Sequence, residues 1–380
     1  MHFGVIGAGG RGSIAKLAHR PDDGFELKIV CDTRHEVHNE YRQEFGDQVI
    51  ATDDWRQVIA RDDLDAVFIA TPDYLHEEHA VAALERGLAV YLEKPMAITV
   101  EGCDRILQTA ERHGGRLYVG HNMRFFPVMR KIKELIDAKT IGTVQAIWCR
   151  HFIDYGGDAY FKDWHSEQRY STSLLLQKAS HDIDMIHWFA GGHTRRTVGM
   201  GKLSVYNQVN NRRASDEKVS VVFDKANWPP LAQTKLSPVI DVEDHSMILM
   251  QLDNGVQASY QQCHYTPDSH RNYTIIGTEG RIENQGDYST ESHQAEVNLW
   301  TNRGDQHETI RIPSTPGTHG GADPEVVADF LRFLETGHTH GASPLDARMS
   351  VATGVMATQS LRAGSQPYDV PAVAHRGNAH

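Results

Sequence analysis

Residues 3–12 read FGVIGAGGRG, an apolar run followed at once by a glycine-rich turn. Gly7, Gly9 and Gly12 have the G-x-G-x-x-G spacing, and Gly10 and Arg11 lie between the last two of these glycines. Glycine at these positions permits a tight turn, a close approach of the backbone to a pyrophosphate and close packing of the following helix. The N–H groups at the start of that helix attract phosphate. The stretch therefore predicts a strand, turn and helix that bind a dinucleotide.

An acidic residue follows the turn at the spacing that a dinucleotide site requires. Asp32 lies twenty residues beyond Gly12, at the end of the next apolar run. A carboxylate at this point accepts hydrogen bonds from the adenosine ribose and repels the additional 2′-phosphate of NADP. Arg34 lies close enough in the sequence to weaken that repulsion. We therefore predict NAD as the preferred cofactor.

Short runs rich in Val, Ile and Leu recur along the first third of the chain, and helical patterns separate them. Runs of this kind form strands that are buried on both faces of a parallel sheet. The helical segments 75–86 and 99–113 are each followed by glycine, a common helix end. The alternation predicts an α/β fold with a doubly wound parallel sheet, an N-terminal Rossmann domain over residues 1–123. The predicted strands span residues 3–7, 27–31, 66–71, 89–92 and 117–120.

The pattern changes after residue 123. Apolar and polar residues now alternate, and turn signals such as Asp253-Asn254-Gly255 separate the runs. We therefore predict a C-terminal α+β domain over residues 124–380, with a mostly antiparallel sheet that serves substrate binding. Its predicted strands span residues 144–149, 219–223, 246–252, 256–261 and 273–277, and its predicted helices span residues 127–139, 181–190, 324–335 and 346–363.

The composition fits a chain of two globular domains. The protein has 380 residues, of which 40% are hydrophobic and 23% are charged, and these values exclude disordered and fibrous chains. No apolar run is long enough to cross a membrane. A net charge of −12 without a basic cluster argues against nucleic-acid binding. The four cysteines are isolated, so we expect a cytoplasmic protein without nucleic-acid or membrane partners.

Two further motifs follow predicted strands, at the edge where open α/β sheets bind ligands. Glu93-Lys94-Pro95 comes directly after the run 89–92, and Thr71-Pro72 lies at the end of the run 66–71. Lys94 can donate a hydrogen bond to a substrate hydroxyl and take part in the transfer of its proton.

These motifs, in this order, resemble the Gfo/Idh/MocA family of oxidoreductases, which is named for glucose–fructose oxidoreductase and inositol dehydrogenase. The resemblance runs over nearly the whole chain, through residues 120–125, 276–280 and 343–346. It implies a large open C-terminal sheet that packs into homodimers or homotetramers, and a sugar, cyclitol or glycoside substrate. The NAD contacts that it implies or that the turn predicts are Gly7, Gly9, Gly10, Arg11, Gly12, Asp32, Thr71, Pro72, His76, Glu93, Lys94, Asn122 and Trp164.

The family's second catalytic segment looks like D-x-x-x-H-x-x-D on a helix, and residues 177–184 match it except at the first position. His181 and Asp184 correspond, but Gln177 stands in place of the first Asp. An amide cannot take up a proton, so the base is His181, a residue type with an unperturbed pKa of about 6.5, or a lysine. Lys178 lies one helical turn before His181 and adds a second cation. The candidate catalytic residues are therefore Lys94, His181 and Lys178.

Loop residues are expected to complete the carbohydrate site, because glycine-rich loops beside a cleft often carry binding residues. Tyr155 precedes two glycines, and His319 lies within Gly317-Thr318-His319-Gly320-Gly321. No metal is expected, since His181, Asp184 and His187 cannot all lie on one helix face. The candidate substrate-binding residues are Lys94, Arg124, Tyr155, Gln177, Lys178, His181, Asp184 and His319.

Three functions of different classes follow. The first is an NAD-dependent oxidoreductase that removes a hydride from the carbon of a secondary hydroxyl. The second is a redox-neutral, NAD-dependent glycoside hydrolase that oxidises C3, eliminates the aglycone, adds water and reduces C3 again, for example on sulfoquinovosides. The change to Gln177 favours this second function. The third is a dinucleotide-sensing regulatory protein, against which the retained Lys94 and His181 argue.

Overall fold

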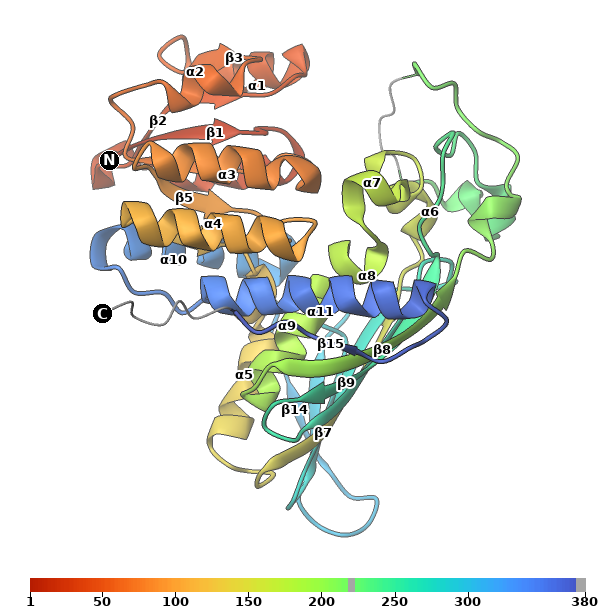
Figure 1. Cartoon of the computed structure of the whole chain (residues 1–380). Helices are drawn as coiled ribbons and strands as arrows, with labels where there is room; N and C mark the ends of the chain where they lie inside the picture. The colour runs from red at the N-terminus through yellow and green to blue at the C-terminus, as the bar shows by residue number, and fades with distance from the viewer. Residues whose placement is uncertain (218–222, 374–380) are drawn as a thin grey trace, which may run out of the picture. The chain divides into compact units, whose positions relative to one another are not determined.

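The computed structural model describes residues 1–217 and 223–373, which form two compact units (Figure 1). The first unit comprises Met1–Arg130, Tyr288–Ser292 and Ser314–Arg348, and the remaining residues make up the second. The sequence prediction used a single boundary after residue 123. The structure differs by returning Ser314–Arg348 to the first unit.

A six-stranded parallel sheet forms the centre of the first unit. Its strands run from edge to edge in the order β3 (Ile50–Thr52), β2 (Glu26–Cys31), β1 (His2–Ile6), β4 (Ala66–Ile69), β5 (Ala89–Leu92) and β6 (Leu117–Val119). The chain order reverses between β1 and β4, the place where doubly wound sheets bind ligands beside the carboxyl ends of their strands. The predicted doubly wound α/β fold is confirmed.

The helices of this unit follow from local sequence signals. Thr99 caps α4 (Val100–His113) by accepting a hydrogen bond from the backbone N–H of Gly102, at 3.0 Å, and Gly114 ends the helix in a left-handed conformation. Figure 1 shows α3 and α4 lying side by side. The other helices are η1 (Gly10–Ala18), α1 (His35–Phe45), α2 (Trp55–Ile59), α3 (His76–Glu85) and α10 (Ala322–Thr336), with the short 3₁₀ segments η2 (Pro21–Asp23), η3 (Asp73–Leu75), η4 (Asn122–Phe125) and η9 (Thr318–Gly321).

Aromatic packing explains why α10, so late in the sequence, belongs to the first unit. The ring of Phe330 is fully buried and lies 5.0 Å from Phe68, 5.4 Å from Tyr91 and 5.5 Å from Tyr118, measured between ring centroids. These three rings come from β4, β5 and β6. Burial of such rings stabilises a domain strongly, so α10 completes the core of the parallel sheet.

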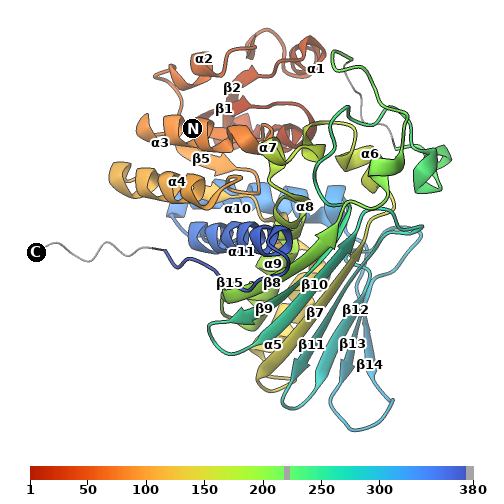
Figure 2. The same ribbon diagram turned by 45° about the vertical axis from the view of Figure 1, so that its right-hand side comes forward.

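The second unit is built on a nine-stranded, mostly antiparallel sheet, as predicted (Figure 2). Within this nine-stranded sheet, β10 and β7 form the one parallel pair of described strands, and the other printed neighbours run antiparallel. Residues 219–222 of the predicted strand 219–223 lie outside the described residues. From edge to edge the strands are β14 (Glu308–Arg311), β13 (Glu296–Trp300), β12 (Arg281–Gln285), β11 (His270–Gly277), β7 (Val144–Phe152), β10 (Gln257–Cys263), β9 (His245–Leu252), β8 (Thr194–Lys202) and β15 (Tyr368–Asp369).

Helix α9 (Ala179–Ala190) covers part of one face of this sheet, because it contacts β7 and β10. Its own side chains Ile183, Ile186 and Phe189 are buried, and Gly191 ends the helix in a left-handed conformation. Both the predicted helix and its glycine end are confirmed. The remaining α-helices are α5 (Pro127–Asp137), α6 (Gly156–Tyr160), α7 (Gln168–Ser171), α8 (Leu174–Gln177) and α11 (Pro344–Arg362).

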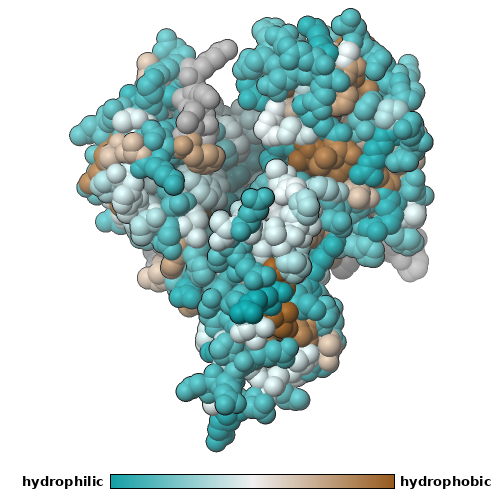
Figure 3. All heavy atoms as spheres, turned by 180° about the vertical axis from the view of Figure 1, so that it is seen from behind, coloured by the Kyte–Doolittle hydropathy of each residue, from teal (hydrophilic) through white to brown (hydrophobic). Residues whose placement is uncertain are grey.

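The visible face in Figure 3 is covered mainly by hydrophilic residues, with apolar residues in small groups. Within the described part of the chain, no helix has the length and apolar character that crossing a membrane requires.

Candidate functional site

The glycine turn has the geometry that a pyrophosphate site needs. Gly7 adopts a left-handed φ of 82°, and a Cβ atom on Gly12 would lie only 1.8 Å from the carbonyl oxygen of Gly7. Gly10 also has a left-handed φ, 54°, and no atom lies within 4 Å of the position that its Cβ would take. The turn is therefore tight on its inner side and open at Gly10. These residues fit a bound dinucleotide.

Asp32 lies beside this turn at the end of β2. One carboxylate oxygen accepts a hydrogen bond from the backbone N–H of Gly9 at 2.8 Å, and the other accepts one from Nε of Arg34 at 3.0 Å. Burial raises the pKa of Asp32, but its hydrogen bonds with Arg34 and Gly9 outweigh burial and lower the pKa. The carboxylate is therefore ionised and oriented by the turn. The half-exposed Arg34 side chain covers it.

A cluster of charged groups joins the glycine turn to the lysine motif. Arg11 donates from Nε and Nη2 to one oxygen of Glu93, at 3.1 and 2.9 Å, and from Nη1 to Asp323 at 2.9 Å. Arg11 and Glu93 were predicted as cofactor contacts, whereas Asp323 was not identified from the sequence. The sequence feature that could have pointed to Asp323 is its position four residues after the candidate residue His319, at the start of a helix.

Asp323 also holds the loop that carries His319. Its second oxygen accepts hydrogen bonds from Thr318 Oγ1 and from Nδ1 of His319 at 2.8 Å, while Asn122 Nδ2 donates to its first oxygen at 3.3 Å. Burial raises the pKa of Asp323, but its contacts with His319 and Arg11 outweigh burial and lower it. The structure thus brings the predicted residues Arg11, Glu93, Asn122 and His319 together around one ionised carboxylate.

Lys94 follows Glu93 directly, and its side chain is partly exposed. Its backbone N–H donates to the carboxylate of Glu93 at 3.2 Å. His76 is fully buried, and its two ring nitrogens lie 2.7 Å from the carbonyl oxygen of Pro95 and 2.9 Å from that of Thr71. His76 therefore ties the loop at Thr71 and Pro72 to the loop that carries Lys94.

Arg124 is buried and engaged within the first unit. Its guanidinium lies 3.3 Å from the carboxylate of Asp346 and donates to the carbonyl oxygen of Gly341 at 3.4 Å. These contacts hold η4 to the start of α11.

The second unit carries the other candidate catalytic residues at the N-terminal end of α9. Lys178 precedes the helix and His181 lies in its first turn, and both side chains are partly exposed. Gln177 and Asp184 are buried. Residues three apart on a helix are neighbours on its surface. The ammonium group of Lys178 and the imidazole of His181 therefore lie side by side at the N-terminal end of α9.

Beneath this helix end lies a buried network that was not identified from the sequence. Asp182 lies 3.1 Å from Nε of Arg271 and 3.3 Å from Nδ1 of His151, and it accepts the hydroxyl of Tyr273. Burial raises the pKa of Asp182, but Arg271 and His151 outweigh burial and lower it, while burial and Arg271 lower the pKa of His151 to about 3. The network therefore consists of an ionised carboxylate, a guanidinium and a neutral imidazole, which anchor α9 to β7 and β11.

Aromatic side chains surround Lys178. Its Nζ donates to the hydroxyl of Tyr155 at 3.4 Å and lies 5.6 Å from the ring centroid of Tyr160. Trp164, another predicted cofactor contact, stacks on His165 with ring centroids 3.7 Å apart. The structure therefore brings Tyr155 to Lys178, as expected for residues of one binding site.

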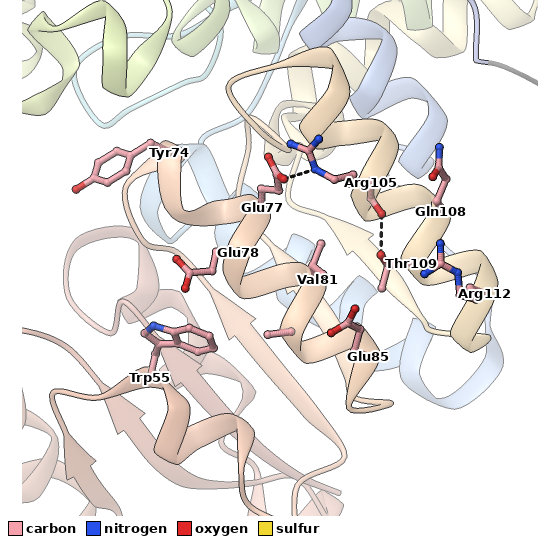
Figure 4. Close-up of a pocket in the computed structure, with 11 residues that line it drawn as sticks. Trp55, Tyr74, Glu77, Glu78, Val81, Glu85, Arg105, Gln108, Thr109 and Arg112 are labelled. Carbon is pink, nitrogen blue, oxygen red and sulfur yellow. Dashed lines mark hydrogen bonds and ion pairs between the residues drawn. The ribbon is translucent and has the colours of Figure 1, made fainter.

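The described residues also bear on two other kinds of site, a metal site and a surface groove. No group of three or more His, Cys, Asp or Glu side chains is arranged to hold a metal ion there. A surface groove of about 670 Å³ lies between α3 and α4, and Figure 4 shows that Glu77 and Arg105 pair across it. None of the predicted site residues lines this groove.

Comparison with known proteins identifies the family. A model described as "Oxidoreductase family, NAD-binding Rossmann fold" matches residues 1–121, and one described as "Oxidoreductase family, C-terminal alpha/beta domain" matches residues 133–370. The inositol 2-dehydrogenase/D-chiro-inositol 3-dehydrogenase of Halalkalibacterium halodurans is 30% identical over 50% of this chain and 52% of that protein. The match thus spans about half the length of this relative.

Two further proteins match nearly the whole chain. The alpha-N-acetylgalactosaminidase of Shewanella oneidensis is 24% identical over 98% of this chain and 84% of that protein. A solved structure of levoglucosan dehydrogenase in complex with NADH and L-sorbose has a TM-score of 0.78 at 22% identity, and the match covers 98% of this chain and 99% of that one. The fold, the NAD cofactor and the family expected from the sequence are therefore confirmed, and the chain belongs to the Gfo/Idh/MocA family of NAD-binding oxidoreductases.

Proposed function

We propose that this protein oxidises a secondary hydroxyl of a sugar or cyclitol with NAD. The observation that carries this proposal is the cluster of Arg11, Glu93 and Asp323, which links the glycine turn to Lys94 and to the loop of His319. A dinucleotide at the turn therefore lies in the same unit as a partly exposed lysine suited to a substrate hydroxyl. The names of two relatives, an inositol dehydrogenase and a levoglucosan dehydrogenase, support this substrate class.

In this mechanism the bound cofactor supplies a reversible hydride acceptor. Lys94 donates a hydrogen bond to the substrate hydroxyl and orients the carbon that bears it. His181 accepts the hydroxyl proton as the carbonyl forms, because Gln177 offers no carboxylate for that step. With NAD bound, Asp32 would hold the ribose, and Trp164 and Asn122 are the further cofactor contacts that we propose.

The direct test is NADH formation by the purified protein with NAD and a panel of sugars and cyclitols. Lys94→Ala should lower turnover by about 10²–10⁴-fold, the usual contribution of an acid–base group, while NAD binding stays within about twofold. Lys202→Ala, an exposed lysine on β8, is the matched control. Near-normal turnover of Lys94→Ala would remove Lys94 from the mechanism.

A redox-neutral glycosidase is the second candidate, favoured by Gln177 and by the likeness to an alpha-N-acetylgalactosaminidase over 98% of this chain. Oxidation at C3 makes the C2 proton acidic, so that its removal expels the aglycone from C1. Water then adds at C1, C2 regains a proton, and the hydride returns to C3. Release of p-nitrophenol from glycosides without net NADH distinguishes this function from the first.

We further propose that the protein forms a homodimer or homotetramer through the second unit's sheet. Trp148, Met200, Met247 and Leu249 are 49%, 55%, 43% and 63% exposed. Met200 lies opposite Met247 on the neighbouring strand, and Ser259 lies opposite both Leu249 and Trp148 on the strands to either side. Residues opposite each other, or two apart on one strand, point to the same side of a sheet, so the four side chains share one face. Leu249→Arg should yield monomers in light scattering, and unchanged assembly would contradict the interface.

The four cysteines form no disulfide bond, which supports a reducing, cytoplasmic location.

A further inference from the structure

The ammonium group of Lys178 lacks a carboxylate partner among residues 1–217 and 223–373. Its nitrogen donates to the Tyr155 hydroxyl at 3.4 Å and lies over the rings of Tyr155 and Tyr160, at 5.8 and 5.6 Å from their centroids. Burial lowers the pKa of Lys178, but the oxygens of Tyr155 and Tyr160 outweigh burial and raise the pKa above the ordinary lysine value. Lys178 is therefore a cation at neutral pH.

The acidic groups nearby are already engaged. Asp182 pairs with Arg271 at 3.1 Å, and Asp287 pairs with the same arginine at 2.9 Å. Gln177, the neighbour of Lys178, is uncharged. Lys162 provides the contrast within the same unit, because it pairs with Asp158 at 2.8 Å. A partly buried cation without a counter-ion is costly, so the balance of charge around Lys178 favours an anion from outside the chain.

A second polar group beside Lys178 also lacks a partner. His264 is fully buried, its ring centroid lies 5.2 Å from that of Tyr160, and neither ring nitrogen makes a hydrogen bond to the described residues. Burial lowers the pKa of His264 well below the ordinary histidine value, so its neutral ring offers one N–H donor and one acceptor. Buried polar groups are usually satisfied, and a ligand group or water at this place would satisfy this ring.

We propose that the Lys178 ammonium, with the Tyr155 hydroxyl, binds a negatively charged substituent of the carbohydrate substrate. The substrates would then be acidic sugars that carry a carboxylate, a sulfonate or a phosphate. This inference rests on the proposed function, in which a carbohydrate occupies the N-terminal end of α9. Lys178 and His181 are neighbours on the helix, so an anion on Lys178 sets which hydroxyl of the sugar ring reaches His181.

The test measures binding rather than turnover. The full-length protein, saturated with NADH, is titrated calorimetrically with D-glucuronate, glucose 6-phosphate and 6-deoxy-6-sulfoglucose, with D-glucose as the neutral reference and inorganic phosphate and sulfate as free anions. At least one charged sugar should bind about 10-fold or more tightly than glucose, the usual effect of a hydrogen bond to a charged group. The sugar that binds most tightly identifies the anionic substituent.

Variants then assign this preference to Lys178. Lys178→Met and Lys178→Gln should both remove the preference, Lys178→Arg should retain most of it, and Lys202→Met should leave it unchanged. Equal binding of glucose and all charged sugars, or a preference that survives both Lys178→Met and Lys178→Gln, would overturn the inference. Binding of free phosphate as tightly as any charged sugar would also overturn it. Lys178-dependent binding of an acidic sugar without NADH formation or glycoside cleavage would instead contradict the proposed function alone.

Discussion

Asp323 in the first unit and Asp182 in the second each hold one arginine and one histidine, but water reaches the two clusters very differently. Asp323 pairs with Arg11 and His319, whose side chains are 33% and 47% exposed. Asp182 pairs with Arg271 and His151, whose side chains are 8% and 6% exposed. The same three kinds of group therefore form a surface that can meet ligands in one unit and a buried support for a helix in the other.

The buried cluster should show the largest effect on stability. Asp182→Asn removes the charge that balances Arg271, and breaking one side of a buried ion pair typically costs about 3–5 kcal/mol. Urea unfolding of the variant should show this loss in the free energy of unfolding. Asp287→Asn, which affects the same arginine from a more exposed place, should cost clearly less. Equal losses in the two variants would mean that burial does not set the cost.

The buried histidine should make stability depend on pH. Burial and Arg271 lower the pKa of His151 to about 3, whereas an unfolded histidine has a pKa of about 6.5. Below pH 6.5 this histidine binds a proton in the unfolded chain but stays neutral in the folded one. Its contribution to the free energy of unfolding is therefore fully present above pH 6.5 and is lost as the pH falls toward 3. The slope due to this residue approaches about 1.4 kcal/mol per pH unit.

Unfolding free energies measured between pH 7.5 and about 4.5 test this linkage. His151→Asn should flatten the slope, whatever it does to stability at neutral pH, because the variant side chain does not titrate. His293→Asn, at an exposed position of the same unit, should leave the slope unchanged. An identical slope in the His151→Asn protein would show that His151 is not kept neutral.

Because water reaches the Asp323 cluster, the Asp323 carboxylate should contribute less to stability than the buried Asp182 does. It should contribute more to ligand binding. Asp323→Asn keeps the shape of the side chain but removes the charge shared by Arg11 and His319, and we expect a loss of about 1–3 kcal/mol in unfolding free energy. NAD binding should weaken as well, because Arg11 belongs to the glycine turn. Glu325→Gln, on the same helix but exposed, is the control. Unchanged NAD affinity in the Asp323→Asn protein would separate the cluster from the cofactor site.

Most of the fold could be predicted from the sequence, because hydrophobic periodicity reports local structure directly. Apart from the predicted strand 219–223, most of which lies outside the described residues, the predicted strands agree with the structure to within three residues at each end. Strand β3 has only three residues, and α1 buries few apolar side chains (Val37 and Tyr41 among them), so neither gave a clear pattern. Strand β8 begins with the charged and polar sequence TRRT, which likewise hid its alternation.

The site could be predicted only where a motif is local. The glycine turn, Asp32, Lys94 and the segment 177–184 are short patterns with known spacing, so the sequence alone singles each of them out as a candidate. Asp323 meets Arg11 across 312 positions, and Asp182 meets Arg271 across about 90. No spacing links such pairs, so the carboxylate at the centre of each cluster became visible only in the folded chain.

The smallest stability effect is expected at His319, and it is the sharpest test of the comparison. His319 has the same partner type as His151, a carboxylate at 2.8 Å, yet its side chain is 47% exposed. Solvent screens such a contact, and pairs of this kind contribute about 0–1 kcal/mol. His319→Gln should therefore change the unfolding free energy by less than about 0.5 kcal/mol. If the loop contacts substrate, the same variant should raise KM for the sugar several-fold and leave NAD affinity intact. A stability loss as large as that expected for Asp182→Asn, with KM unchanged, would instead make the Asp323 cluster a second structural support.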